Sequence, residues 1–344
     1  MKSNIRELQT RPVLFTRAGV LKPFERLFKD IGAPYQKFLR HSGIPTDLIY
    51  DADAPVPLIP TYKFIESAAS AEGEEHLALL ASKYFNLEDL GHYGQSLSRS
   101  TTVYDYLNTG IKFYDQIVCG EKIWITKAHG KMHFCHSTPA GIPESQKQIS
   151  LFCLGTIINT LRLVCGENWA PETIGLPTRV SQKLPFDFLA NTRVVHSPGY
   201  SFFTFPEHFL TQAFRLPKTS SKMPWESRPK DPVEFETDFA SSVSQLVGLL
   251  ITDGYPDIHI VAEATGLSKR TLQRKLFEEN TSYSRLVEEF RIGKACDWLE
   301  RSDMPITLIS QELAYRDATN FSRAFRRKTG QSPINYRRNF RSMS

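Results

Sequence analysis

A stretch near the C-terminal end of the chain, "FSRAFRRKTGQSP" (321–333), combines cations with aromatic anchors. Four basic side chains and two phenylalanines share eight positions of it: Phe321, Arg323, Phe325, Arg326, Arg327 and Lys328. Arginine can donate two hydrogen bonds to one guanine, and arginine and lysine neutralise backbone phosphates. If these cations share one face of a helix, the stretch predicts contact with a nucleic acid.

Helical geometry places the two kinds of side chain on different faces. At about 100° per residue, the two phenylalanines point in nearly the same direction. Asn320, Arg323 and Arg327 point away from them, and Gly330 and Pro333 then end the helix. We therefore expect the phenylalanines to seat the helix in a core and the basic side chains to face outward.

The same pattern occurs a second time upstream. "VAEATGLSKRTLQRKLFEEN" aligns with "ISQELAYRDATNFSRAFRRKT" after one inserted residue in the turn. Each unit has a short helix, a tight turn and a second helix, and Leu272 and Leu276 take the places of the two phenylalanines. The sequence therefore predicts two helix-turn-helix units, at about 259–280 and 307–330.

A segment with helical periodicity, from about Tyr283 to Arg301, joins the two units. Its nineteen residues would span roughly 28 Å at about 1.5 Å per residue, and one turn of DNA is about 34 Å long. Two helices joined by such a rod suit successive major grooves on one face of a duplex. The alternative is a plain helical bundle with a basic surface.

The distribution of charge along the chain agrees with a polyanionic partner. The net charge is only +5, but eight of the 42 Lys and Arg residues and one of the 37 Asp and Glu residues lie from Arg316 onward. The rest of the chain is therefore slightly acidic. A basic segment of this kind indicates a nucleic acid, and the alternative is a solvated charged surface.

The segment that precedes the helical region has the composition of a linker. "RLPKTSSKMPWESRPKDP" holds four prolines and no apolar period, so neither a helix nor a central strand can run through it. We predict three parts: residues 1–214, an α+β sensor domain that also dimerises; residues 215–233, a linker; and residues 234–344, an all-α domain with two helix-turn-helix units joined by a long helix.

Within 1–214 the sequence predicts short amphipathic helices and a small sheet. Two β-rich runs flank Ala128-His129-Gly130, which is a hairpin signal, and two more β-like runs follow, "TRVVHS" and "YSFFTF". "SQKQISLFCLGTIINTLRLVCG" predicts a mostly buried helix of about twenty residues. The longest apolar-rich run, 149–158, is shorter than the roughly 20 residues needed to span a bilayer, so we expect no membrane contact.

The second unit resembles a known family. "LISQELAYRDATNFSRAFRRKTGQSPINYRR" is similar to the second helix-turn-helix of AraC/XylS-type transcription regulators, and "GLSKRTLQRKLFEE" is similar to the first. The resemblance implies a sequence-specific regulator that binds double-stranded operator DNA. With the outward-facing arcs, it assigns base and phosphate contacts to Lys269, Arg270, Gln273, Arg274, Ala318, Thr319, Asn320, Arg323, Arg326 and Arg327.

The chain departs from the family pattern at three positions. Ala314 and Thr281 stand where glycine is usual or frequent, and Phe277 occupies the exposed arc where a basic residue is common. The N-terminal part resembles the effector-sensing domain of the arabinose-binding-like subgroup in "GHYGQSLSRSTTVYDYLNTGIKFY" and "FLANTRVVHSPGYSFFTFPEHFLTQAF". This resemblance implies a small-molecule effector of open identity and a homodimer, and it leaves a contact with RNA polymerase open.

Other chemistry finds little support in the sequence. His129, His133, Cys135 and His136 lie close together, but on a hairpin they would not converge on one metal ion, so we expect no metal. No nucleophile elbow, P-loop or dinucleotide fingerprint is found, so we expect neither a cofactor nor an enzyme. Two alternatives stay open: a ligand-independent architectural DNA-binding protein, and an enzyme domain tethered to DNA.

The cysteines indicate the compartment. The chain has five of them, an odd number, without a Cys-x-x-Cys pair, which favours reduced thiols over a disulfide framework. The first residues, "MKSNIRELQTRPVLF", lack the apolar core of a signal peptide. We therefore expect a cytoplasmic protein.

Overall fold

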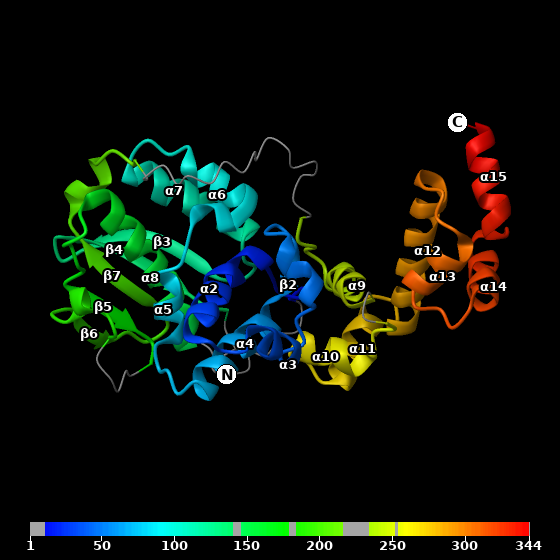
Figure 1. Ribbon diagram of the computed structural model, residues 1–344, viewed down its shortest axis with the longest axis horizontal. Coiled ribbons are helices and arrows are strands. Elements are labelled where there is room, and N and C mark those ends of the chain that lie inside the picture. Colours follow the sequence, from blue (N-terminus) through cyan, green and yellow to red (C-terminus); the bar gives the residue numbers. More distant parts are fainter. Residues whose placement is uncertain (1–10, 140–145, 179–183, 216–233, 252–253, 344) are drawn as a thin grey trace. The chain divides into compact units, whose positions relative to one another are not determined.

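The chain folds into two compact units (Figure 1). The computed structural model describes residues 11–139, 146–178, 184–215, 234–251 and 254–343. Contacts group Leu14–Phe235 into one unit, and Met1–Val13 with Glu236–Ser344 into the other. The first unit is α+β and the second is helical, which confirms the predicted fold class. Apart from Arg215, the predicted linker lies outside the described residues.

A five-stranded sheet forms the centre of the N-terminal unit. Its strands are β3 (Lys122–Ala128), β4 (Lys131–Ser137), β5 (Thr173–Leu176), β6 (Arg193–His196) and β7 (Ser201–Phe205). They lie in the order β3-β4-β7-β5-β6, and only the β5–β6 pair is parallel. The predicted hairpin is β3–β4, and both residues of its turn, His129 and Gly130, have positive φ, as a tight two-residue turn requires.

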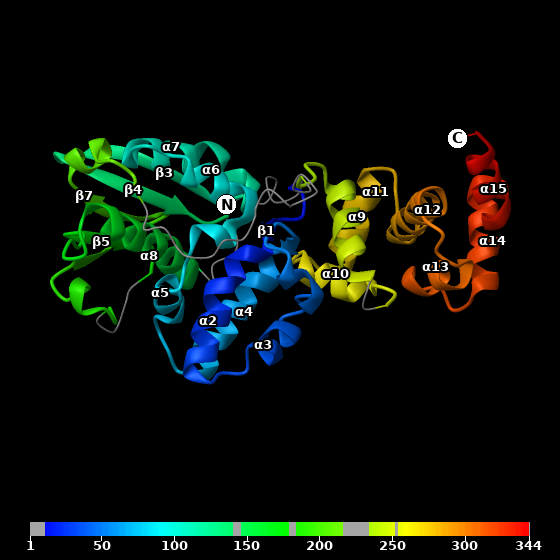
Figure 2. The ribbon, with the colours of Figure 1, turned by 45° about the horizontal axis from the view of Figure 1, so that its top comes forward.

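Helices make up the rest of this unit, and the strands β5, β6 and β7 lie at one side of it (Figures 1 and 2). They are α2 (Lys22–Ile31), α3 (Tyr35–His41), α4 (Leu58–Ala71), α5 (Leu77–Ser82), α6 (Gly91–Ser98), α7 (Val103–Phe113) and α8 (Gln146–Cys165). A two-stranded sheet pairs β1 (Phe15–Arg17) with β2 (Pro55–Pro57). Helix α8 packs against β4, β7 and α5. Gly155 permits close packing with α5, because a Cβ atom there would lie 2.4 Å from Ser82 Oγ.

Helix α8 corrects the expectation that no apolar segment is long enough to cross a bilayer. It is 20 residues long, and its best window has a mean hydropathy of 1.5, so its length and composition would allow it to cross a bilayer. However, 61% of that window is buried inside the unit. Core helices of globular proteins have the same properties, and the packing of α8 against the sheet explains its apolar sequence.

The C-terminal unit consists of helices. They are α9 (Phe239–Leu250), α10 (Ile258–Ala264), α11 (Lys269–Glu278), α12 (Tyr283–Arg301), α13 (Ile306–Glu312), α14 (Ala318–Thr329) and α15 (Pro333–Met343). Both predicted helix-turn-helix units are present, α10–α11 and α13–α14, and the connecting helix α12 has the predicted bounds. Helix α12 contacts α9, which precedes both units, and also α14 and α15, which follow it.

The apolar anchors of both second helices are buried as predicted. Leu272 and Leu276 of α11 are inaccessible to solvent, and so are Phe321 and Phe325 of α14. The two phenylalanines pack in one cluster with Leu299 of α12 and with the apolar residues of α13. The rings of Phe321 and Phe325 lie 5.6 Å apart. The helical periodicity of the sequence therefore identified the seated faces correctly.

The turn of the second unit holds a strained residue. Ala314, which stands where the family usually has glycine, adopts φ 52°. Its N–H donates to Gln311 O at 2.8 Å, and the next N–H, of Tyr315, donates to Ser310 O at 2.9 Å. These bonds satisfy the last carbonyls of α13, so the left-handed conformation at Ala314 ends that helix.

We expect Ala314→Gly to stabilise the C-terminal unit by about 0.5–1 kcal/mol. Glycine removes a left-handed penalty of about 1–2 kcal/mol and loses part of this gain through the entropy of its unfolded state. Ala324→Gly, inside α14, is the matched control and should destabilise by about 1 kcal/mol or more. Urea denaturation of the full chain measures both changes. A loss of stability with Ala314→Gly would contradict the expectation.

Candidate nucleic-acid interface and buried cavity

Helix α11 exposes the four side chains that the sequence selected. Ser268 caps its start, because its Oγ accepts from the Thr271 N–H at 3.2 Å. Lys269, Arg270, Gln273 and Arg274 are all exposed. One basic residue of the helix, Lys275, is instead buried, with its Nζ 4.1 Å from the centre of the Phe239 ring. Arg270 and Arg274 therefore lie on the face of α11 opposite to Leu272 and Leu276, whereas Lys269 is exposed in the first turn.

Helix α14 begins at an aspartate cap. The Asn320 N–H donates to Asp317 Oδ1 at 2.7 Å, and the Asn320 side-chain amide donates to Asp317 Oδ2 at 2.9 Å. The cap thus fixes the start of the helix and also orients the Asn320 amide. Thr319, Asn320, Arg323, Arg326 and Arg327 are exposed, and Ala318 is half-buried.

Ion pairs divide the exposed cations into two groups. Arg327 forms an ion pair with Glu288 of α12, and Lys328 Nζ lies 3.6 Å from Glu289 Oε1. On α11, Arg274 Nε lies 3.6 Å from Glu278 Oε1 within the same helix. Within the ranges that the structure describes, no ion pair involves Arg270, Arg323 or Arg326. These three arginines therefore have their guanidinium groups available to a polyanion.

Sequence reasoning missed a buried arginine that holds the second unit together. Arg291 of α12 donates from Nε to the Leu313 carbonyl at 2.5 Å, and its guanidinium carbon lies 3.4 Å from the centre of the Tyr315 ring. Burial lowers the pKa of Arg291. The hydrogen bond ties the end of α13 to α12, and so it sets the position from which α14 begins. In the sequence, the aromatic residue after the turn, Tyr315, was the one signal that could have indicated a cation packed beside it.

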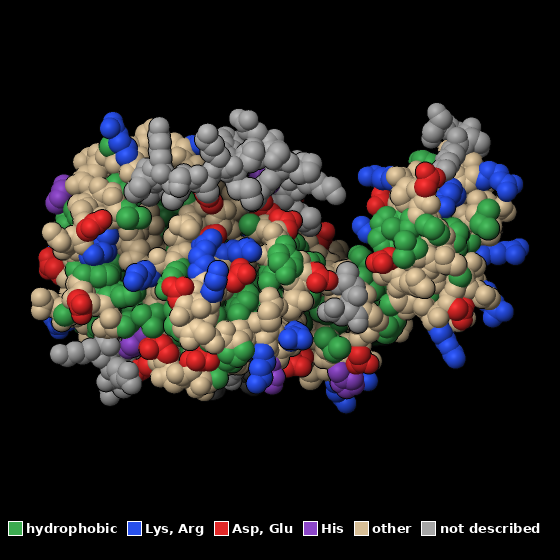
Figure 3. Space-filling model, in the orientation of Figure 1, with side chains coloured by type: hydrophobic (Ala, Val, Ile, Leu, Met, Phe, Trp, Pro, Cys, Tyr) green, Lys and Arg blue, Asp and Glu red, His purple; other side chains and the backbone are tan. Residues whose placement is uncertain are grey.

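Basic side chains project from the surface that α12 to α15 form, visible as blue groups on that part of the chain in Figure 3. An α-helix fits the major groove of DNA when exposed polar and cationic residues lie on its outer face. Both α11 and α14 have such a face, and α12 separates them by nineteen residues, or roughly 28 Å. The C-terminal unit therefore has two candidate reading helices.

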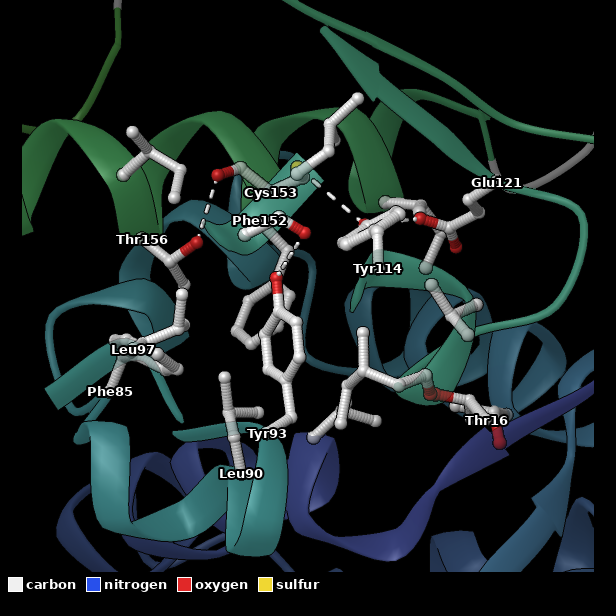
Figure 4. A pocket seen from close by; sticks show the side chains of 18 of the residues that line it. Thr16, Phe85, Leu90, Tyr93, Leu97, Tyr114, Glu121, Phe152, Cys153 and Thr156 are labelled. Atoms are coloured by element: carbon white, nitrogen blue, oxygen red, sulfur yellow. Dashed lines mark hydrogen bonds between the residues drawn. The ribbon is translucent and has the colours of Figure 1, made fainter. Parts of the chain in front are cut away.

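A cavity of about 110 Å³ lies inside the N-terminal unit (Figure 4). It lies between α8, α6, α7, α4 and the start of β3, whose side chains line it. Most of these side chains are aliphatic or aromatic, among them Phe24, Leu97, Phe134 and Phe152. Ligand sites are typically apolar cavities with a few placed polar groups, so this cavity is the candidate effector site.

Glu121 provides the polar end of the cavity. It is 5% exposed and follows Gly120 at the entry to β3. Tyr62 donates to its Oε1, Tyr114 donates to its Oε2 at 2.9 Å, and His136 Nε2 lies 2.8 Å from the same Oε2. Burial raises the pKa of the Tyr114 hydroxyl and of the Tyr62 hydroxyl, so both keep their protons for these bonds.

The sequence interpretation of this region needs one change. The sequence predicts ordinary hairpin histidines, but His136 is fully buried and contacts Glu121. Phe134 belongs to the hydrophobic core, Tyr114 and Phe152 pack against it, and all three also line the cavity. Within the described residues, no three His, Cys, Asp or Glu side chains are placed to hold a metal ion.

The described cysteines are free thiols, and the cavity thiol is not reactive. Cys153 lines the cavity and lies 3.9 Å from the Tyr114 hydroxyl. Burial raises the pKa of the Cys153 thiol well above its usual range. A thiol that stays protonated is a poor nucleophile, so Cys153 acts as part of the apolar wall.

The chain has an α+β domain with an internal cavity, and a helical domain with two helix-turn-helix units follows it in the sequence. These features define a DNA-binding regulator of two domains. Residues 32–213 match the family described as the arabinose-binding domain of AraC transcription regulators, N-terminal. Residues 261–339 match a helix-turn-helix domain family. The chain belongs to the AraC family of transcription regulators. It is a DNA-binding regulator with an effector-binding N-terminal domain, as the sequence predicted.

Relatives along the whole chain agree with this assignment. The chain is 24% identical over 328 residues to the HTH-type transcriptional regulator VqsM of Pseudomonas aeruginosa, covering 92% of this chain and 99% of that protein. It is 21% identical over 346 residues to the ornithine utilization regulator of the same organism, covering 95% and 98%. Both relatives are named as regulators and not as enzymes.

A solved structure is also similar. The transcriptional regulator CdpR from Pseudomonas aeruginosa is 20% identical, with coverage of 76% of this chain and 86% of that chain and a TM-score of 0.35.

Proposed function

We propose that α11 and α14 read operator DNA in two successive major grooves. Arg270, Arg323 and Arg326 carry this proposal, because they are exposed and unpaired within the described part of the chain. Lys269, Gln273, Arg274, Ala318, Thr319, Asn320 and Arg327 complete the proposed contact surface. Arginine and glutamine can read guanine and adenine, and the remaining cations would neutralise phosphates.

The length of α12 sets the geometry of this proposal. Roughly 28 Å of helix between the two units is close to the roughly 34 Å repeat of DNA. Hydroxyl-radical footprinting on a duplex selected from a random pool should show two protected windows, one helical turn apart. One protected window would contradict the second reading helix, and equal affinity for selected and random DNA at fixed salt would indicate an architectural binder.

We propose that the effector binds in the cavity at Glu121. Its binding shifts the population of chains toward or away from the conformation in which both reading helices fit the operator. The apolar walls and the buried carboxylate support this assignment. The match of residues 32–213 to the family of arabinose-binding domains of AraC regulators also supports an effector site in this unit.

Family membership supports three further proposals. The chain acts as a homodimer, it contacts RNA polymerase when bound to its operator, and it works in the cytoplasm. The relatives that span the chain are regulators, so we also propose that the N-terminal unit binds its small molecule without converting it. Light scattering of the full chain, with and without operator DNA, tests the dimer.

A further inference from the structure

The volume of the cavity limits the size of its ligand. An apolar cavity of about 150 Å³ in another protein holds one benzene molecule. The cavity described here has about 110 Å³ and is walled by rings and branched aliphatic side chains. It therefore suits one molecule of about the size of a single six-membered ring.

Hydrogen bonding limits the polar groups of the ligand. A hydroxyl group has one hydrogen to donate and two lone pairs that accept. Six of the seven hydroxyls among the described lining residues already donate their hydrogen to protein acceptors: Thr16 to Ile117 O, Thr61 to Pro57 O, Tyr62 and Tyr114 to Glu121, Tyr93 to Gly110 O, and Thr156 to Cys153 O. These six can only accept a hydrogen bond from a ligand, and the seventh, Tyr106, is hydrogen-bonded to the Thr160 side chain.

The carboxylate at the end of the cavity is also an acceptor. An ionised carboxylate offers about four acceptor positions. Tyr114 and His136 lie at Oε2 of Glu121, and among the described residues Tyr62 alone donates to Oε1, so one position on Oε1 is open. A ligand that donates a hydrogen bond can use it. The bond would be charge-assisted and stronger than a bond between neutral groups.

Charge excludes anionic ligands. The described residues that line the cavity include no lysine, arginine or histidine, and their one carboxylate is Glu121. A carboxylate ligand would be buried beside the Glu121 carboxylate, and no lysine or arginine among the described lining residues could pair with it, so its binding is disfavoured. A sugar is also a poor fit, because each of its many hydroxyls needs a partner in a largely apolar cavity.

We propose that this cavity binds an uncharged, ring-sized, mostly apolar molecule that donates a hydrogen bond to Glu121 Oε1, in the chemical class of a simple phenol or arylamine. The inference rests on the proposed role of the cavity as the effector site. It assigns Glu121 as the residue that orients the ligand, with Tyr62, Tyr114 and His136 holding the carboxylate in place.

A series of related ring compounds tests the proposal on the full chain. Phenol and aniline donate a hydrogen bond, toluene has no polar group, benzaldehyde only accepts, and benzoate is an anion. We expect phenol and aniline to raise the melting temperature of the N-terminal unit in a saturable way, because a ligand that binds the folded state stabilises it. Toluene should bind at least about tenfold more weakly, as expected for one lost hydrogen bond to a charged group. Benzaldehyde and benzoate should cause no shift.

Three variants locate the binding. Glu121→Gln should weaken phenol binding about tenfold, because the neutral amide is a weaker acceptor. Glu207→Gln makes the same change at an exposed carboxylate and should leave phenol binding unchanged. Ile157→Phe fills the cavity from a half-buried lining position without removing a polar group, and it should abolish the shift. This last variant keeps the test valid if Glu121→Gln fails to fold.

Four results would overturn the proposal. They are equal binding of benzoate and phenol, equal binding of toluene and phenol, a phenol response that Ile157→Phe does not change, and no binding of any ring compound. Binding to selected operator DNA is measured on the same sample. A chain that binds DNA but none of the ring compounds would contradict the ligand class alone. A chain that binds phenol in the cavity but no selected DNA would contradict the proposed DNA contacts and not the ligand class.

Discussion

Phe325→Ala is expected to lower the free energy of unfolding of the C-terminal unit by about 3–5 kcal/mol, the usual loss when a buried phenylalanine is truncated. The Phe325 ring is inaccessible to solvent and packs between Phe321 and Tyr336, at centroid distances of 5.6 and 5.4 Å. Its removal leaves a cavity directly under α14. Because the same helix carries Arg323 and Arg326, operator binding should be lost although no basic residue is changed.

Hydrogen exchange of the α14 amides in the full chain measures this loss as reduced protection. Phe277→Ala is the matched control, because Phe277 lies on the other second helix, α11, and is 79% exposed. A surface change of this kind should alter stability by less than about 0.5 kcal/mol. Equal protection of α14 in the Phe325→Ala and Phe277→Ala proteins would mean that Phe325 does not seat the helix.

The second large effect concerns a base contact. Arg323→Ala should lower operator affinity by about 1–3 kcal/mol and relax the preference at one base pair, as for the loss of one bidentate arginine–guanine contact. The Arg323 side chain is exposed near the middle of α14, and no ion pair involves it within the described chain. Its loss should therefore leave the fold unchanged.

Gel-shift titration at fixed salt against the selected operator and its single-base variants measures both parts of this prediction. Arg40→Ala is the charge control, because it removes one exposed arginine from α3 in the N-terminal unit. It should leave both affinity and base preference unchanged. If Arg323→Ala weakens binding to all duplexes equally, the side chain contacts a phosphate and not a base.

The fold of the C-terminal unit was largely predictable from the sequence. Helical periodicity, the repeated pattern and the capping residues are local signals, and they gave the bounds of α12 and the burial of Phe321 and Phe325 correctly. Strand β5 was missed, because four residues, "TIGL", are too few to show an alternating pattern. Its position depends on pairing with β6 and β7, which is not local.

The candidate effector site was not predictable in the same way. Glu121 receives its hydrogen bonds from Tyr62 on α4, from Tyr114 and from His136 on β4, and 59 residues separate Tyr62 from Glu121. Isolated acids are common on protein surfaces, so nothing in the sequence near Glu121 marks it as buried. Likewise, the sequence shows Lys275 as one of several basic residues on α11. Its burial becomes evident from the structure, in which α9 packs against it through Phe239.

The pairing of Arg327 and Lys328 with glutamates of α12 affects how binding would respond to salt. A cation that leaves an acidic neighbour for a phosphate exposes that neighbour, which then attracts a sodium or potassium ion from solution. The net release of small ions on binding is smaller by that amount. The number of basic side chains on α14 would therefore overstate how steeply affinity falls with ionic strength, because Glu288 would compete with DNA phosphates for Arg327 and Lys328.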